Sequence, residues 1–278
     1  MAPGDRREAI LEVIRSARRR LVLSVFRCDD FKVLDALDEA IQRKVRVEAL
    51  LTPRAKGWEK RLSDLEAFLE SMGAGVHRFQ DTVVKYHAKY LVADDGPALI
   101  ASLNFTRKCF ERTCDFVLVT HDPEVVSGLQ KLFDADCQAQ ESFLPQGVSD
   151  RLIVSPERAR AQFTELIRQA RRSIRIIDRR IEDPAIVTLL KTQRSKGITV
   201  ELLGDASLRG MIPHGRLLLV DEQVAAIGSI SLEAPAMDFR REVAVVVRHP
   251  ECVAQLNKFF HSLSSRGGKA RAKAKAKD

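Results

Sequence analysis

The chain has 278 residues, of which 45% are hydrophobic and 30% charged, and its formal net charge at pH 7 is +8. This composition is typical of a globular protein that forms one large domain or two of ordinary size. No apolar run is long enough to cross a bilayer, and the charged N-terminal stretch lacks the apolar core of a secretory signal, so we expect a cytoplasmic protein that contacts membranes only peripherally.

Apolar spacing predicts alternating helices and strands along the first part of the chain. These elements are a helix at 5–20, a strand at 21–26, a helix at 31–43 and a strand at 45–51. The same succession returns 153 residues later, as a comparison of residues 10–17 (ILEVIRSA) with 163–170 (FTELIRQA) illustrates. The alternation favours an α/β fold, and the repetition favours two similar halves packed about a pseudo-two-fold axis.

The first half is longer than the second, because it has 26 extra residues between its second strand and the motif described below. This insert includes a predicted helix at 56–71, which glycines end. We expect contacts specific to the first half there. Closing helices are predicted at 123–140 and 250–263, and the Pro- and Gly-containing stretch at 143–150 is predicted to connect the halves.

The end of the chain carries most of the net charge. Residues 265–278 hold six basic residues and one acid, whereas the remainder has 40 basic and 37 acidic residues. We predict a disordered tail that either contacts anionic lipid or nucleic acid non-specifically or serves only solubility. The five cysteines form no C-x-x-C pair and no zinc spacing, which indicates reduced thiols and predicts neither a metal nor a cofactor.

A polar motif recurs at the equivalent place in both halves. Residues 87–94 (HAKYLVAD) return 127 positions later as residues 214–221 (HGRLLLVD). Chance would produce only about 0.07 matches to this pattern in a chain of this composition. At matched distances, each copy is followed by two polar residues and an acid. These are Ser102, Asn104 and Asp115 in the first half, and Ser229, Ser231 and Glu242 in the second.

Each motif is predicted to begin a β-hairpin. His87 and Lys89 are two residues apart, so their side chains leave a strand on the same face. A four-residue loop would set His87 opposite Asn104 and Lys89 opposite Ser102, and the second hairpin would repeat this arrangement. A slip of one residue would change every one of these neighbours.

Two histidines and two cations in one centre suit a phosphodiester substrate. Lys89 and Arg216 would neutralise the non-bridging oxygens. One neutral histidine would attack phosphorus, and the other would protonate the leaving alkoxide and then activate water or an alcohol. We expect Asp115 and Glu242 each to hydrogen-bond the histidine of its own half, as the acid of a triad does.

The H-x-K-x4-D motif, the S-x-N that follows it and their degenerate repeat resemble the phospholipase D superfamily over residues 5–264. The resemblance implies two α/β halves, each a mixed sheet flanked by helices, whose motifs meet at the interface and react through a phosphohistidine. His87 would be the nucleophile and His214 the acid and base. The resemblance implies catalytic roles for His87, Lys89, Asp94, His214, Arg216 and Asp221, and phosphate binding by Ser102, Asn104, Ser229 and Ser231. Asp94 and Asp221 equally suit tight turns.

The chain departs from the family's pattern at several positions. Arg216 stands in place of Lys and Ser231 in place of Asn, so the second motif is weakened. In the first half, Ala101 replaces Gly and Asp115 replaces Glu.

We therefore predict a first phospholipase D-like half at 1–147, a second at 148–264 and the tail at 265–278. A monomer is expected, since the duplication supplies both halves of the site. The leading function is a metal-independent phosphodiesterase or phosphatidyltransferase acting on phospholipids, because few aromatic residues are present to stack on bases. The alternatives are a nuclease of the same superfamily and a binding protein with an impaired site.

Overall fold

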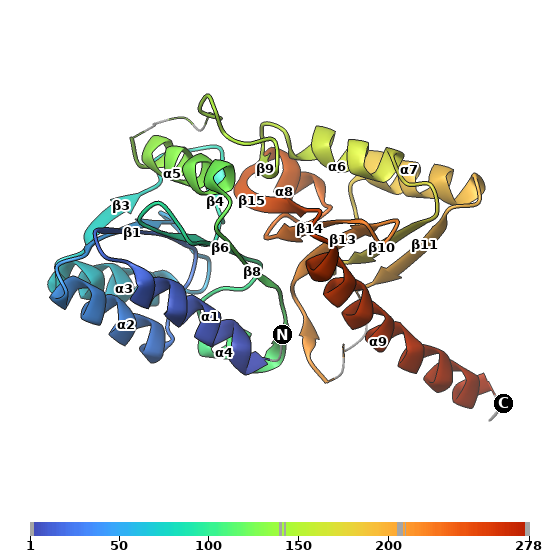
Figure 1. Ribbon diagram of the computed structural model, residues 1–278, viewed down its shortest axis with the longest axis horizontal. Helices are drawn as coiled ribbons and strands as arrows, with labels where there is room; N and C mark the ends of the chain where they lie inside the picture. Colours follow the sequence, from blue (N-terminus) through green and yellow to red (C-terminus); the bar gives the residue numbers. More distant parts are fainter. Residues whose placement is uncertain (1–2, 139–140, 142, 205–207, 209, 276–278) are drawn as a thin grey trace.

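The computed structural model of the protein describes residues 3–138, 141, 143–204, 208 and 210–275. Two sheets lie side by side with helices on their outer faces (Figure 1). The first half contains α1 Pro3–Ser16, β1 Arg20–Val25, α2 Phe31–Gln42, β2 Arg46–Leu51, α3 Glu59–Met72, β3 Gly75–Arg78, β4 Lys85–Tyr86, β5 Tyr90–Ala93, β6 Ala98–Ala101, α4 Arg107–Arg112, β7 Thr113–Cys114, β8 Val117–Thr120 and α5 Pro123–Gln138. The second half contains β9 Leu152–Ser155, α6 Ala159–Arg168, β10 Ser173–Ile177, α7 Pro184–Ser195, β11 Thr199–Leu203, β12 Ile212–Pro213, β13 Arg216–Val220, β14 Val224–Gly228, α8 Ala234–Asp238, β15 Arg240–Val247 and α9 Pro250–Lys275.

The two sheets repeat one strand order. The first runs β3-β2-β1-β5-β6-β8, and the second runs β11-β10-β13-β14-β15, with β4 and β9 both paired to β15. In each sheet the inner strand, β1 or β10, has a parallel neighbour on one side and an antiparallel neighbour on the other. The predicted α/β fold with mixed sheets is confirmed. The pseudo-two-fold axis stays a prediction, with which the repeated order is consistent.

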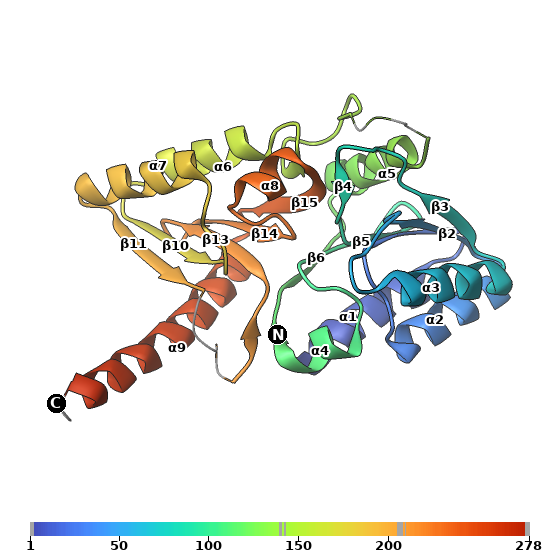
Figure 2. The same ribbon diagram turned by 180° about the vertical axis from the view of Figure 1, so that it is seen from behind.

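Amphipathic helices seal both sheets. In α2 the buried residues Val33, Leu34, Leu37 and Ala40 recur at helical spacing and form one apolar stripe. Helices α1 to α3 lie on one side of the first sheet and α5 on the other, while α6 and α7 lie opposite α9 on the second (Figures 1 and 2). Between these outer layers, one central core contains buried side chains from both sheets and from α5 and α9. The two halves are therefore joined by a common hydrophobic core as well as by the linker between them.

Short strands and buried charges also join the halves. Strand β4 pairs in parallel with β15, and β7 pairs in parallel with β12. The fully buried guanidinium of Arg241 on β15 lies 3.1 Å from Asp136 of α5 and 2.6 Å from Glu157, which follows β9. A buried cation held by two carboxylates fixes these three segments relative to one another.

The register of both hairpins differs from the predicted one by a residue. In the first hairpin, Val92 pairs with Ala98. The backbone amide of Ala101 donates to the carbonyl of Lys89. Lys89 therefore lies opposite Ala101, and Arg216 likewise lies opposite Gly228. The cause is a loop of three residues instead of four, which Asp94 makes possible by adopting a left-handed φ of 47°.

The last helix is longer than predicted. Helix α9 continues to Lys275 instead of ending near residue 263, and residues 276–278 lie outside the described part. The disorder predicted for residues 265–278 stays a prediction. Lys, Arg and Ala are good helix formers, so a helix begun at Pro250 can continue through them. No helix among the described residues is both long and apolar enough to cross a membrane.

Candidate active site

The first motif histidine lies where the chain crosses to the other half. Strand β4 ends at Tyr86, which pairs with Arg241 of β15, so the next residues along both strands meet. These are His87 and Glu242, and their Nδ1 and Oε1 atoms are 2.7 Å apart. The Glu242 side chain is fully buried, whereas the imidazole is 26% exposed. The Nδ1 side of the ring is therefore bound to Glu242, while part of the ring remains accessible to solvent.

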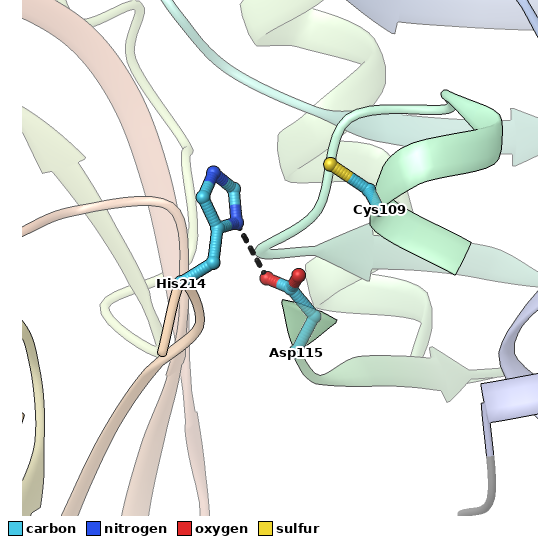
Figure 3. A group of neighbouring side chains, drawn as sticks. All are labelled: Cys109, Asp115 and His214. Atoms are coloured by element: carbon cyan, nitrogen blue, oxygen red, sulfur yellow. Dashed lines mark hydrogen bonds and ion pairs between the residues drawn. The ribbon is translucent and has the colours of Figure 1, made fainter. Parts of the chain in front are cut away.

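The second histidine is placed in the same way. Strand β12 ends at Pro213, which pairs with Cys114 of β7. The following residues, His214 and Asp115, are joined by a contact of 2.9 Å between Nδ1 and Oδ1 (Figure 3). The second ring nitrogen points away from the carboxylate (Figure 3). Both imidazoles thus use Nδ1 for an acid and leave Nε2 for another partner.

The acids are crossed between the halves. The sequence predicts that Asp115 serves His87 and that Glu242 serves His214, but the structure pairs each histidine with the acid of the opposite half. The reason is the crossing of β4 and β12, which brings each histidine to the end of a strand that belongs to the other repeat. Spacing along the chain cannot reveal such an exchange.

Burial sets the protonation of the first motif. It lowers the pKa of His87 to about 4, and the nearby charge of Lys89 adds to the effect while Glu242 opposes it. The Phe26 ring packs edge-on against His87, with 4.6 Å between ring centroids, and supplies part of this apolar cover. The imidazole is consequently neutral at pH 7. The glutamate is ionised, since the histidine and Lys89 hold its pKa below the usual value despite burial.

The two motif cations are arranged alike but paired differently. Lys89 and Arg216 each donate to the backbone carbonyl of the histidine two residues earlier. Burial lowers the pKa of Lys89 to about 7, with Glu242 opposing the shift and the charge of Arg216 contributing to it, so the two motif cations act on each other electrostatically. Arg216 Nε also lies 3.0 Å from Asp178, whereas Lys89 has an aromatic neighbour, with Nζ 5.4 Å from the Phe26 centroid.

Asp178 and Phe26 are site residues that the sequence does not reveal as such. Strand pairing sets Leu21 and Ile174 at equivalent places, so Asp178 occupies the position of the buried Val25. A charged residue at the end of an otherwise apolar strand, at a position where its repeat has valine, is the signal that could have identified it.

The four predicted phosphate-binding residues have different partners. Ser102 donates to Asp115 at 2.7 Å and accepts the amide of Phe116 at 2.9 Å, while Ser229 contacts Val243 at 3.4 Å. Ser231 donates to Asp178 and so supports the partner of Arg216. The amide oxygen of Asn104 is buried with no hydrogen-bond partner among the described residues.

Asp94 and Asp221 lie at the far end of their hairpins from the histidines. The Asp94 carboxylate accepts the backbone amides of residues 18, 19 and 20, each at 2.8 Å. Asp221 accepts those of residues 171, 172 and 173 at 2.7–2.8 Å. The structure does not bring these acids to the histidines, and their contacts are those of turn residues. Their assignment as catalytic residues is therefore corrected.

Cys109, Asp115 and His214 form a group whose potential metal ligands lie within 4.8 Å of one another (Figure 3). The chemistry of this group does not fit a metal. Asp115 already accepts hydrogen bonds from Ser102, Thr113 and His214, and the Arg6 guanidinium lies 3.9 Å from it. Burial and the nearby carboxylate raise the pKa of the Cys109 thiol, which opposes the thiolate that a metal requires. Within the group, Asp115 instead holds the ring of His214 by a hydrogen bond to Nδ1.

A cavity of about 1100 Å³ opens beside the first histidine. His87, Phe26, Tyr86 and Arg240 line it, and the remaining lining comes from residues 52–59 and 78–85. Both segments lie between β2 and His87, the stretch in which the first half has 26 more residues than the second. The predicted half-specific contacts thus lie next to a motif histidine.

The first half of the chain is similar to a known protein family. Residues 10–137 match the family model described as "Cardiolipin synthase, PLD-like domain". Over 149 residues, 52% of this chain, the sequence is 26% identical to Cardiolipin synthase A of Pseudomonas aeruginosa strain LESB58. The match covers 30% of that protein, so the chain spans about a third of the length of the curated relatives that it matches.

Two solved structures have the same fold over nearly the whole chain. Phosphatidylserine synthase from Haemophilus influenzae Rd KW20 has a TM-score of 0.72 at 12% identity and covers 93% of this chain and 84% of its own. Polyphosphate kinase from Porphyromonas gingivalis has a TM-score of 0.71 at 18% identity and covers 90% of this chain and 43% of its own. The resemblance to the phospholipase D superfamily that the motif predicts is confirmed for residues 10–137, which are similar to the phospholipase D-like domain of cardiolipin synthase.

Proposed function

We propose that the protein cleaves or exchanges a phosphodiester bond of a phospholipid through a phosphohistidine on His87. The observation that supports this most is the pair of crossed histidine–acid contacts, which occupy Nδ1 in both rings. Both Nε2 atoms are then left for a substrate. Phospholipid is favoured as substrate by the names of the relatives, a cardiolipin synthase and a phosphatidylserine synthase.

The proposed reaction has two displacements. Nε2 of the neutral His87 attacks phosphorus and forms a P–N bond, while the P–O bond to the leaving alkoxide breaks and His214 gives that oxygen a proton. Water or an alcohol then attacks phosphorus, gives its proton to His214 and breaks the P–N bond. Lys89 and Arg216 stabilise the charge on the non-bridging oxygens. Glu242 stabilises the positive ring that forms when His87 is phosphorylated.

Trapping the intermediate tests this proposal. The protein is incubated in EDTA with ³²P-labelled phosphatidylcholine, phosphatidylglycerol, DNA or RNA, denatured at alkaline pH to preserve phosphohistidine, and mapped by mass spectrometry. We expect label on His87 with phospholipid, and a loss of turnover of about 10²–10⁴-fold in His87→Ala and in His214→Ala.

Three outcomes would contradict the proposal in different ways. Label on His214 would reverse the roles of the two histidines. Turnover of nucleic acid alone would make the protein a nuclease. Neither label nor turnover with any of the four substrates would indicate a binding protein with an impaired site.

A further inference from the structure

Three positions at which the two halves carry different side chains meet at one carboxylate in the second half. The equivalent pairs, first half then second, are Lys89 and Arg216, Asn104 and Ser231, and Val25 and Asp178. Arg216 Nε lies 3.0 Å from Asp178 Oδ1, and the Ser231 hydroxyl donates to the same oxygen at 3.0 Å. The three replacements therefore form one contacting group instead of three separate losses.

The Asp178 carboxylate has little freedom to move. Its side chain is 2% exposed, Oδ1 accepts the backbone amide of Arg180 at 2.9 Å, and Oδ2 accepts that of Leu232 at 2.7 Å. These amides belong to two different segments, one after β10 and the other after β14. The carboxylate is thus anchored on two sides and can hold a cation at a fixed place. The equivalent Val25 has no side-chain acceptor and cannot do so.

The two charges of this buried pair support each other. Burial raises the pKa of Asp178, whereas the Arg216 charge opposes the shift and favours the ionised carboxylate. Arg216 Nε is buried and has no hydrogen-bond partner among the described residues, so its contact with Asp178 is an ion pair. Removing one member of a buried pair leaves the charge of the other uncompensated. The position of the guanidinium therefore depends on Asp178.

The same geometry leaves part of the guanidinium for a ligand. Nη1 of Arg216 donates to the carbonyl of His214, which is the contact that Lys89 makes with the carbonyl of His87. Among the described residues Nη2 donates no hydrogen bond, and 20% of the side chain is exposed. A forked guanidinium can therefore contact Asp178, the His214 carbonyl and a phosphate oxygen through separate nitrogens, whereas a lysine offers only one nitrogen.

We propose that Asp178 is a positioning residue that holds the Arg216 guanidinium where it meets a phosphate oxygen, and that Asp178, Arg216 and Ser231 act as one unit. The inference rests on the proposed function, in which Arg216 stabilises charge on the non-bridging oxygens. Asp178 acts only through Arg216, since a carboxylate in contact with the phosphate would repel it. The unit replaces the lysine and asparagine of the first motif with a cation of equal charge whose place is fixed by a partner.

Returning the unit to its first-half equivalents tests this proposal, with a p-nitrophenyl phosphodiester as substrate. We expect Asp178→Val alone, and Arg216→Lys combined with Ser231→Asn, each to lower kcat by about tenfold, and the triple variant to recover to within about threefold of the wild type. Asp178→Val frees the guanidinium, the double variant leaves a buried carboxylate beside the phosphate, and the triple variant has neither defect. KM should change less than kcat, because the oriented charge matters most in the transition state. Losses that multiply in the triple variant, to about a hundredfold, would overturn the unit.

A matched control is a buried aspartate of the same half whose partner is not a motif cation. Asp183 is buried, pairs with Arg160 and accepts the amide of Ile186 at 3.0 Å. Asp183→Val should lower the melting temperature but leave kcat per folded molecule unchanged. A loss of kcat equal to that of Asp178→Val would make the effect a general consequence of breaking a buried ion pair, and would overturn the positioning role.

Rotation of the guanidinium separates positioning from catalysis. In protein labelled with ¹⁵N-arginine, the NMR signals of Arg216 are identified by their absence from Arg216→Lys. We expect separate Nη signals in the wild type, because the held guanidinium rotates slowly, and one averaged signal in Asp178→Asn, which keeps the size of the side chain. Slow rotation that is lost in Asp178→Asn, in a wild type that turns over no substrate, would support the positioning role and reject the proposed function. Equal rotation in the two proteins would overturn the positioning role whatever the activity.

Discussion

At the scale of single residues, the protonation of Lys89 and His87 defines the pH range in which the site can work. The proposed reaction needs a charged Lys89 and a neutral His87. Burial lowers the pKa of the lysine to about 7 and that of the histidine to about 4. Above about pH 7 the free protein loses the Lys89 charge, and below about pH 4 its histidine becomes protonated.

We therefore expect kcat/KM to be highest between about pH 4 and 7 and to fall as the pH rises through the pKa of Lys89. The variant Lys89→Arg should extend the alkaline limit, because a guanidinium keeps its proton to a pH above about 12. Measuring kcat/KM from pH 3.5 to pH 10, a range chosen to include both limits, for both proteins tests this. An alkaline limit at the same pH in the variant would exclude Lys89 as its cause.

The sequence identifies most of the site at this scale because its reactive residues recur in two copies. His87, Lys89, His214 and Arg216 all lie at the junction. A search for residues that recur in both copies misses Asp178, because the equivalent position of the first repeat is Val25. The effect of Asp178 is nevertheless direct, because it forms an ion pair with Arg216, whereas Lys89 has no ion pair within 4 Å among the described residues.

At the scale of elements, apolar periodicity locates the long helices well and the short strands poorly. The predicted helix at 31–43 is observed at Phe31–Gln42, because its stripe of buried residues is encoded locally. Strands β4, β7 and β12 have two residues each, and their pairing depends on the other half. The hairpin loops are also one residue shorter than predicted, because Asp94 and Asp221 tolerate the left-handed backbone conformation.

The role of these loop aspartates can be tested by substitution. Asp94→Ala removes an acceptor of three backbone hydrogen bonds, so we expect the free energy of unfolding to fall by about 1–3 kcal/mol. Urea denaturation measures this loss, and Asp221→Ala should behave alike. Activity per folded molecule should be unchanged, because the loops lie away from the histidines. Lost activity at full stability would return these residues to the active site.

At the scale of the whole molecule, the two halves exchange their acids. Glu242 of the second half orients His87 of the first, and Asp115 of the first orients His214 of the second. The central core, to which both sheets contribute, holds this arrangement. The sequence predicts two similar halves, but which acid meets which histidine depends on how the halves pack.

The exchange predicts distinct kinetic defects for the two acids. With a p-nitrophenyl phosphodiester, whose leaving group needs no proton, Asp115→Asn should still give a burst of p-nitrophenol and then accumulate phosphohistidine, since it impairs His214. Glu242→Gln should show no burst, with the first step slowed by about 10²–10⁴-fold. Stopped-flow absorbance measures both, and equal melting temperatures would confirm intact folds. The opposite pattern would favour acids that serve their own halves.

Exchanged acids also constrain how such a duplicated chain can change over generations. If each copy kept its own acid, one copy could decay while the other retained an oriented imidazole. Here a substitution at position 242 damages the partner repeat's histidine, and one at position 115 does the reverse. The repeats can diverge in their loops, as the insert after β2 illustrates. Neither repeat, however, can lose its acid at this junction without impairing the histidine of the other.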